Sequence, residues 1–425
     1  MILRYILCVV VFLGSSLAQA GGLDDVGRQR VLKALQDGVD PNVQSLSAND
    51  VLVLKAIVAL DDGETRHALD ILSAQRLKKD PLLAILEAEA YRRSALEAVE
   101  KAGGYAKNLT HQQELLKDAD LSSGLREANV RLSSLADKLD GVAGFPLDLL
   151  QVDARIYSVF LVDKARSRLF VYARDGTGNL VRVADEYVVT GFQQGDKHQE
   201  GDARTPNGIY RFVRRLQGRS LDVRYGPVAY PIDYPNSLDH LHHKDGSGIW
   251  LHGYAEGVGR RPPRDTKGCF ALPNSRLLAV SKYVQLGKSW VIVGEDFKFN
   301  DDRQRDVLKA SVKESLEAWR KDWSALNTPA YLAHYHKDFH SGRWNLAAWK
   351  RYKMRVNAKK SFVDVKISHL TLIHDPNEWR EGEVVVAEFD QAYRSDNYQD
   401  MTHKRIYWVR KDRTDAWKIL LEEML

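Results

Sequence analysis

The spacing of hydrophobic positions changes twice along the chain. Between residues 24 and 145, alanine and leucine recur at helical spacing, most clearly in the runs 51–60 and 82–91. These runs begin 31 positions apart, close to the period of helix-hairpin repeats. Two weak copies do not establish a repeat, and a small helical bundle is the favoured interpretation. We predict an all-α region over residues 21–148, either a bundle or a repeat-like packing surface.

The segment from about 150 to 295 has the pattern of strands and turns. Runs rich in Val, Ile, Tyr and Phe alternate with clusters of Gly, Pro, Asp and Asn, which favour turns. The predicted strands are 156–162, 168–172, 187–190 and 289–293. We therefore predict a mostly β domain with long loops over residues 149–296.

The last 120 residues return to helices and then to strands. One apolar face is predicted from the spacing of Leu308, Val312, Leu316, Trp319 and Trp323. A second helix near 344–354 precedes alternating runs at 362–373, 384–393, 404–409 and 416–421. This order predicts an α+β domain over residues 305–425. A group of basic residues lies in and after the second helix. We interpret it as a solvated helix face rather than a contact for an anionic polymer. The group contains Arg343, Lys350, Arg351, Lys353, Arg355, Lys359 and Lys360.

Residues 1–20 have the pattern of a cleavable secretory signal. Arg4 precedes an apolar run from Ile6 to Leu17, and Ala18-Gln19-Ala20 forms a small-x-small cleavage site. The apolar run is shorter than the ~20 residues that span a membrane. The sequence therefore predicts export, and we expect a periplasmic protein.

Composition narrows the class of protein. A hydrophobic content of 44% excludes a disordered chain, and 425 residues suggest about three domains. The 62 basic and 57 acidic residues leave a formal charge of only +5, so nucleic acid is not an expected partner. Of two cysteines, Cys8 lies in the signal, and Cys269 is alone in the mature chain. An unpaired thiol in an exported protein indicates a reactive role or intermolecular pairing.

The residues around Cys269 favour a reactive role. His252 lies 17 positions before Cys269, at the end of a short apolar run that predicts a buried strand. A nearby imidazole can take the thiol proton and produce a thiolate at neutral pH. Gly268 permits close backbone approach, and peptide N–H groups around Cys269 could face an oxyanion. An arbitrary pair of this kind is more often a core cysteine and a core histidine, but these surroundings favour catalysis.

These residues resemble the signature of the L,D-transpeptidase (YkuD-type) family, a His-Gly element followed after a loop by Ser/Thr-x-Gly-Cys. His252-Gly253 and Thr266-Lys267-Gly268-Cys269 match it, and residues 201–210 and 230–236 are similar to two upstream family motifs. The resemblance covers roughly residues 150–295.

The resemblance also implies a role for each matched residue. Cys269 would be the nucleophile, His252 the general base, the Gly253 carbonyl the group that orients the imidazole, and the Gly268 and Cys269 amides part of the oxyanion hole. Many members of the family have histidine where this chain has Lys267, so a role for that second histidine is not implied here.

Other polar residues in this region are candidates for substrate binding. Arg264 could meet a substrate carboxylate or be an ordinary surface arginine. The segment 239–243, Asp-His-Leu-His-His, has zinc-compatible side chains, and His240 and His242 would share a face of a strand. No second ligand pair has diagnostic spacing, so we expect neither a metal nor a cofactor. We place these two histidines, with Tyr234, Thr266 and Lys267, along a substrate groove.

The C-terminal segment resembles the cone-shaped nuclear transport factor two-like (SnoaL-like) fold, through its paired helices and the strand patterns at 389–393 and 417–419. Together the resemblances imply a multidomain cysteine enzyme acting on peptidoglycan stem peptides. It would cleave before the terminal D-alanine and transfer the acyl group to an amine, as a transpeptidase, or to water, as an L,D-carboxypeptidase that trims the wall and sets cell shape. The helical region could bind a protein partner, and a homodimer is open. The alternative is a wall-binding scaffold with a decayed site.

Overall fold

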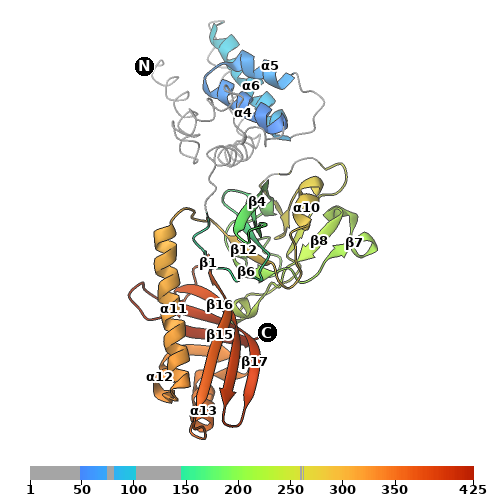
Figure 1. Ribbon diagram of the computed structural model, residues 1–425. Helices are drawn as coiled ribbons and strands as arrows, with labels where there is room; N and C mark the ends of the chain where they lie inside the picture. The colour runs from blue at the N-terminus through green and yellow to red at the C-terminus, as the bar shows by residue number, and fades with distance from the viewer. Residues whose placement is uncertain (1–47, 74–80, 102–144, 259–260, 262) are drawn as a thin grey trace.

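The computed structural model describes residues 48–73, 81–101, 145–258, 261 and 263–425. The predicted signal segment and Cys8 lie outside these residues. Helices come first, a β-rich part follows, and an α+β part ends the chain (Figure 1). This order confirms the predicted multidomain fold class. None of the helices in the described ranges is long and apolar enough to cross a membrane.

Three helices make up the described N-terminal part. They are α4 (Ala48–Asp61), α5 (Thr65–Ser73) and α6 (Pro81–Lys101), and the predicted runs 51–60 and 82–91 lie within α4 and α6. Small and branched side chains form one buried cluster between them, including Val53, Ala56, Leu60, Ala68, Leu72, Leu86 and Ala90. Arg93 of α6 donates to the Leu60 carbonyl, which connects the first and third helices.

The middle part contains a five-stranded sheet with the order β4-β3-β2-β12-β6. β12 is the last strand of this part in sequence, and it lies between β2 and β6 in the sheet. It runs parallel to β2 and antiparallel to β6. Every position of β2 and β12 is buried. This burial on both faces accounts for their runs of consecutive apolar residues in place of an alternating pattern. The strands are β2 (Ser158–Asp163), β3 (Arg168–Arg174), β4 (Leu180–Tyr187), β6 (Gly208–Arg211) and β12 (Trp290–Gly294).

A second sheet of four strands, ordered β11-β9-β8-β7, shares a core with the first. Phe160 and Phe212 meet edge to face in this core, with ring centroids 5.0 Å apart. The strands are β7 (Leu216–Gln217), β8 (Val228–Pro231), β9 (Trp250–His252) and β11 (Phe270–Ala271). A parallel pair, β5 (Thr190–Gly191) and β10 (Arg264–Thr266), lies beside them with the helices η1 (Gly218–Ser220), η2 (Val223–Tyr225), α9 (Ser237–Leu241) and α10 (Asn274–Ser281).

The C-terminal part packs three helices against a seven-stranded sheet (Figure 1). The predicted apolar face of α11 is buried at Leu308, Val312, Leu316, Trp319 and Trp323, so that prediction is confirmed. The helices are α11 (Asp302–Ser324), α12 (Thr328–Ala333) and α13 (Leu346–Asn357). The sheet order is β1-β15-β16-β17-β18-β13-β14, with β1 (Leu149–Gln151), β13 (Tyr335–Ser341), β14 (Trp344–Asn345), β15 (Val363–His374), β16 (Glu383–Ser395), β17 (Gln399–Arg410) and β18 (Lys418–Met424).

One basic residue of α13 departs from the predicted solvated face. Lys353 is buried, and its Nζ lies 4.3 Å from the centroid of the Trp323 ring and 4.5 Å from that of Trp349. Burial lowers the pKa of Lys353 to about 7. Arg343, Lys350, Arg351, Arg355 and Lys359 are exposed, as predicted, and Lys360 is half-buried.

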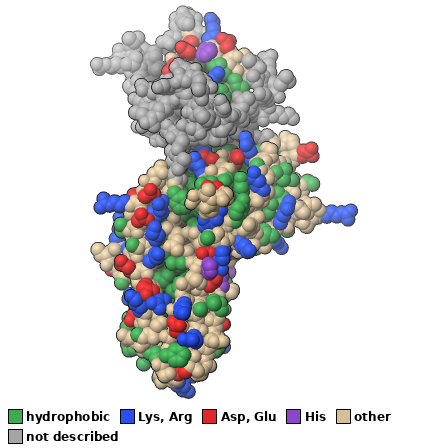
Figure 2. Space-filling view, in the orientation of Figure 1, with side chains coloured by type: hydrophobic (Ala, Val, Ile, Leu, Met, Phe, Trp, Pro, Cys, Tyr) green, Lys and Arg blue, Asp and Glu red, His purple; other side chains and the backbone are tan. Residues whose placement is uncertain are grey.

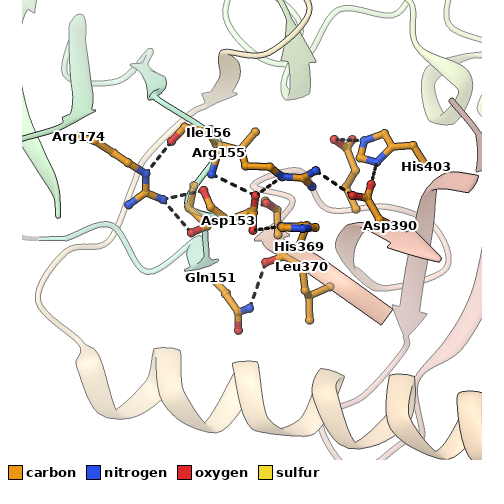
Figure 3. A network of polar contacts seen from close by, with 12 residues as sticks. Gln151, Asp153, Arg155, Ile156, Arg174, His369, Leu370, Asp390 and His403 are labelled. Carbon is orange, nitrogen blue, oxygen red and sulfur yellow. Dashed lines mark hydrogen bonds and ion pairs between the residues drawn. The ribbon is translucent and has the colours of Figure 1, made fainter. Parts of the chain in front are cut away.

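The middle and C-terminal parts are joined by pairing and by ion pairs. β1 precedes the middle part in sequence but pairs antiparallel with β15. In the following segment, the Asp153 carboxylate accepts a hydrogen bond from the Arg155 guanidinium at 2.8 Å (Figure 3). The backbone N–H of Asp153 donates to Oγ1 of Thr371 in β15 at 3.1 Å. Arg155 also reaches Asp390 of β16 at 2.8 Å. These contacts join β1 and the residues that follow it to β15 and β16 of the C-terminal part.

A second set of contacts is buried deeper in this interface. Glu388 of β16 pairs with Arg211 of β6, with Arg405 at 2.9 Å and with His403 at 3.0 Å. Burial raises the pKa of Glu388, but these three partners outweigh burial and bring it to about 2. The Arg211 guanidinium also stacks on Trp290, 3.7 Å from the ring centroid. A carboxylate of the C-terminal sheet thus neutralises an arginine of the middle domain.

Candidate active site

The candidate base, His252, ends a buried strand in the centre of the four-stranded sheet. β9 pairs antiparallel with β8 and parallel with β11, so His252 lies opposite Ala229 on one side and Ala271 on the other. Leu251 is fully buried, and only 3% of His252 is exposed. The apolar run before His252 therefore seats the imidazole at a strand end, as its sequence predicts.

The protonation of His252 follows from its contacts. Nδ1 lies 2.6 Å from the Gly253 carbonyl oxygen. Because a carbonyl can only accept, Nδ1 carries the hydrogen, and Nε2 keeps its lone pair. Burial lowers the pKa of His252 to about 4, although the Gly253 carbonyl raises it, and the imidazole is neutral at pH 7. A neutral imidazole with a free lone pair can accept a proton.

Two residues that the sequence did not single out fix this imidazole. Tyr225 places its ring edge-on to His252, with centroids 5.0 Å apart, and its carbonyl accepts the Gly253 N–H at 2.8 Å. Asn274 accepts the Tyr254 N–H at 2.8 Å and donates to the Tyr254 carbonyl at 3.0 Å. A Cβ on Gly253 would collide with Asn274, which explains the glycine after the histidine. No sequence pattern around His252 identifies Tyr225 or Asn274, because both residues belong to other segments of the chain.

The turn that carries Cys269 is closed by Thr266. The Thr266 hydroxyl donates to the Cys269 carbonyl at 2.6 Å and accepts the Gly268 N–H at 3.1 Å. Gly268 has φ +126°, and a Cβ there would lie 2.7 Å from the Arg204 carbonyl oxygen. Only glycine fits this turn without strain. Thr266, which is predicted from the sequence to lie along a substrate groove, is buried and holds the turn that carries Cys269.

This arrangement changes the expected oxyanion hole. The Gly268 amide is committed to Thr266, so it does not point to an incoming carbonyl in this state. Within the described part of the chain, no hydrogen bond occupies the Cys269 amide. The Cys269 N–H is therefore the donor that remains available to an oxyanion.

The thiol itself faces the segment that leads into β9. Cys269 is half-buried, and its Sγ donates to the Gly248 carbonyl at 3.3 Å. Burial raises the pKa of Cys269 to about 11, although the Trp250 N–H and the positive charge of Arg261 lower it. With His252 neutral, the resting pair is a thiol and an imidazole. Burial opposes both charges of a thiolate–imidazolium pair, so both pKa shifts favour the neutral pair over the thiolate expected from the sequence.

The upstream motif at 201–210 supports the turn rather than taking part in chemistry. Thr205 accepts the Gly191 N–H at 2.8 Å, and its hydroxyl also lies 3.4 Å from the Cys269 carbonyl. Asp202 accepts the amides of His198 and Gln199 and pairs with Lys197 at 2.8 Å. Burial raises the pKa of Asp202, but these donors outweigh it and bring the pKa to about 2. These contacts hold the loop that contains the motif against the turn that carries Cys269.

The remaining predicted groove residues have different surroundings. Tyr234 is buried and donates to the Asp245 carbonyl at 3.0 Å. Lys267 is exposed beside Cys269. Arg264 in β10 lies against the side-chain amide of Gln194. None of these contacts shows a shared groove.

The histidine cluster also differs from its predicted conformation. Residues 237–241 form helix α9, because Asn236 caps the Leu238 and Asp239 amides and Asp239 caps the Asn236 amide in return. His240 is exposed. His242 is bonded to Glu381 of the C-terminal part at 2.7 Å and stacks on Trp379 with centroids 4.3 Å apart. His242 is thus an interface residue, and the shared strand face is wrong. No group of three potential metal ligands occurs among the described residues.

Comparisons with known proteins match this architecture. The sequence model of the L,D-transpeptidase (YkuD) catalytic domain matches residues 157–293, and that of the Cds6 C-terminal NTF2-like domain matches residues 311–423. The solved structure of Bd1075 from Bdellovibrio bacteriovorus is 26% identical with a TM-score of 0.57, over 66% of this chain and 98% of its own. Pgp2 from Campylobacter jejuni, described as a helical cell shape determining protein, is 29% identical with a TM-score of 0.56, over 66% of this chain and 96% of its own. No curated protein sequence matches the chain. Both domain resemblances that the sequence indicated are confirmed.

Proposed function

We propose that this chain, whose residues 157–293 are the catalytic domain of an L,D-transpeptidase-family peptidoglycan enzyme, cleaves tetrapeptide stems before the terminal D-alanine through a thioester on Cys269. The observation that carries the proposal is the state of His252. Its Nδ1 is bound to the Gly253 carbonyl, so its Nε2 is a free proton acceptor at the end of the strand next to the Cys269 turn.

The first half-reaction forms the acyl-enzyme. Sγ of Cys269 adds to the carbonyl carbon of the residue before D-alanine while His252 Nε2 takes the thiol proton. The carbonyl oxygen becomes an oxyanion, which the Cys269 N–H can stabilise. The C–N bond then breaks, His252 returns its proton to the leaving nitrogen, and D-alanine departs with a free amine.

The second half-reaction depends on the acceptor. Water adds to the thioester carbonyl with His252 again taking the proton, and the C–S bond breaks to give a tripeptide and the restored thiol. An amine in place of water gives a new peptide bond and a cross-link. Both routes use the same residues, so the products identify the acceptor.

The experiment is incubation of the purified protein with tetrapeptide muropeptides, followed by mass spectrometry. Tripeptides with released D-alanine would identify an L,D-carboxypeptidase, and dimers would identify a transpeptidase. Cys269→Ala should abolish both while leaving the melting temperature within about 2 °C, because the thiol is half-buried and small. Unchanged muropeptides with the wild-type protein would favour the wall-binding scaffold instead.

The setting of this reaction is also part of the proposal. The predicted signal at 1–20 supports a periplasmic enzyme, and the similarity to Pgp2 supports a role in cell shape. Fractionation of cells that express the full chain should place the processed protein in the periplasm. Deletion of its gene should change cell curvature or width, and a Cys269→Ala copy should not restore the shape.

A further inference from the structure

A charged arm projects from the middle domain at β7. Residues 213–225, called the basic arm here, contain four arginines and one aspartate. Arg224 pairs with that aspartate, Asp222, at 3.0 Å. Arg214, Arg215 and Arg219 are exposed, and no hydrogen bond or ion pair within the described ranges involves them. Basic side chains extend from the edge of the molecule where Figure 1 places β7 (Figure 2).

The unpaired state of these arginines differs from that of other arginines in the same domain. Arg166 pairs with Asp163 at 2.6 Å, and Arg168 pairs with Asp185. Those guanidinium groups have their charges balanced within the fold. The basic arm instead keeps a local charge of about +3, which extends roughly 10 Å into a solution of 0.1 M salt.

The arm is attached directly to the candidate active site. β7 pairs with β8, and β8 pairs with the strand that ends at His252. At the other end of the arm, the Tyr225 carbonyl accepts the Gly253 N–H, and the Tyr225 ring lies 5.0 Å from both Trp250 and His252. A ligand held by the arm would therefore be held by the same sheet that carries His252.

The exposed surface of the arm is not only charged. Val223 is 81% exposed and Val213 is 48% exposed. An apolar side chain beside guanidinium groups suits a partner that offers both carboxylates and aliphatic groups. Peptides rich in alanine and acidic residues have this chemistry, and guanidinium groups bind carboxylates in a bidentate geometry.

We infer that the basic arm binds the carboxylates of peptide stems that neighbour the stem being cleaved, so that the enzyme acts on the peptidoglycan polymer in preference to an isolated stem. This inference rests on the proposed function and deepens it. The polymer must cross the site for Cys269 to reach a stem, and the arm continues from the sheet that carries His252. A strand of several stems offers carboxylates over a longer span than an isolated stem does, so it can reach all three guanidinium groups at once.

The test is binding to insoluble sacculi in the Cys269→Ala background, which removes turnover from the measurement. R214Q/R215Q/R219Q should weaken binding about tenfold in 50 mM salt, as expected for three exposed ion pairs, and the difference should vanish near 0.5 M salt. The matched control, called the α13 control, is K350Q/R351Q/K359Q, with two positions on α13 and one just after its end. It removes the same charge from exposed residues without ion pairs in the described part of the chain. The control should bind like the parent protein.

Three results would overturn the inference. They are unchanged binding and salt dependence in the arm variant, an equal loss in the α13 control, and a preference of the arm for anionic lipid vesicles over sacculi. A second readout uses active enzyme: the arm substitutions should raise KM about tenfold for sacculi and less than twofold for a soluble monomeric stem. Failure of the wild-type enzyme to release D-alanine, with arm-dependent binding intact, would count against the proposed reaction and not against the binding surface.

Discussion

The Cys269 thiol donates its hydrogen bond to the Gly248 carbonyl, 3.3 Å away. Gly248 lies four residues before His252, so the loop that leads to His252 holds the Cys269 thiol in its protonated form. In the proposed reaction, binding of a substrate carbonyl near Sγ replaces this contact before His252 takes the proton. The site is thus arranged to hold a neutral pair until substrate arrives.

Alkylation of Cys269 should be slow in the folded protein. With the pKa raised to about 11 by burial, the thiolate fraction at pH 7 is about a hundredfold below that of an ordinary thiol, and the greater nucleophilicity of the thiolate recovers part of this. We expect a rate constant with iodoacetamide about tenfold below that of a model thiol. Mass spectrometry of a chain that begins at residue 21 measures it directly, because Cys269 is then its single cysteine. Unfolding in urea should restore the ordinary rate; a folded protein that reacts faster than the model thiol would contradict a neutral pair.

The dependence of kcat/KM on pH should show a low acid limb. His252 must be neutral to accept a proton, and burial lowers its pKa to about 4, so activity should fall as the pH drops through about 4. Stability follows the same direction. The unfolded chain binds this proton near pH 6.5, so the contribution of His252 to stability is complete above that pH and is lost toward pH 4. A midpoint of activity near pH 6.5 in a protein that remains folded would show an imidazole that is not buried.

Thr266 should act as a positioning residue. Thr266→Val removes the hydroxyl that joins the Gly268 amide to the Cys269 carbonyl, and the loss of about 1–3 kcal/mol in the turn should lower kcat ten- to a hundredfold with a smaller change in KM. Thr266→Ser should restore most of the rate because it keeps the hydroxyl. Thr177→Val, which removes an exposed hydroxyl bonded to Asp175, is the control and should leave both constants unchanged. Equal losses in the valine and serine variants would point to packing rather than to the hydrogen bonds.

The interface carboxylate Glu388 should matter for stability more than for chemistry. Glu388→Gln leaves Arg211 and Arg405 without their buried counter-charge, and we expect the free energy of unfolding to fall by about 3–5 kcal/mol. Because the pKa of Glu388 is lowered to about 2, its contribution is present above about pH 4.5 and is lost as the pH falls toward 2. Chemical denaturation at pH 7 and pH 3 measures both effects. Asp412→Asn, at an exposed turn, is the control; equal destabilisation by both substitutions would show that net charge alone is responsible.

The sequence by itself determined many of the elements and identified the candidate reacting residues. The helical period of α11 marks the face that is buried, because side chains three and four positions apart share one side of a helix. The apolar run before His252 identifies its strand, and the glycine before Cys269 identifies a backbone position that a side chain cannot occupy. These are local properties, so a local pattern can carry them.

Only the tertiary structure decided how those residues behave. His242 faces Glu381 rather than a substrate, Lys353 is enclosed by Trp323 and Trp349, and the Gly268 amide is taken by Thr266. The first two depend on partners far along the chain or on the packing of whole elements, which no spacing of residues reveals. Burial then decides the charge on Cys269 and His252, because the cost of a charge depends on everything packed around it. Local patterns thus determine which groups can react, and long-range packing determines the protonation state in which they wait.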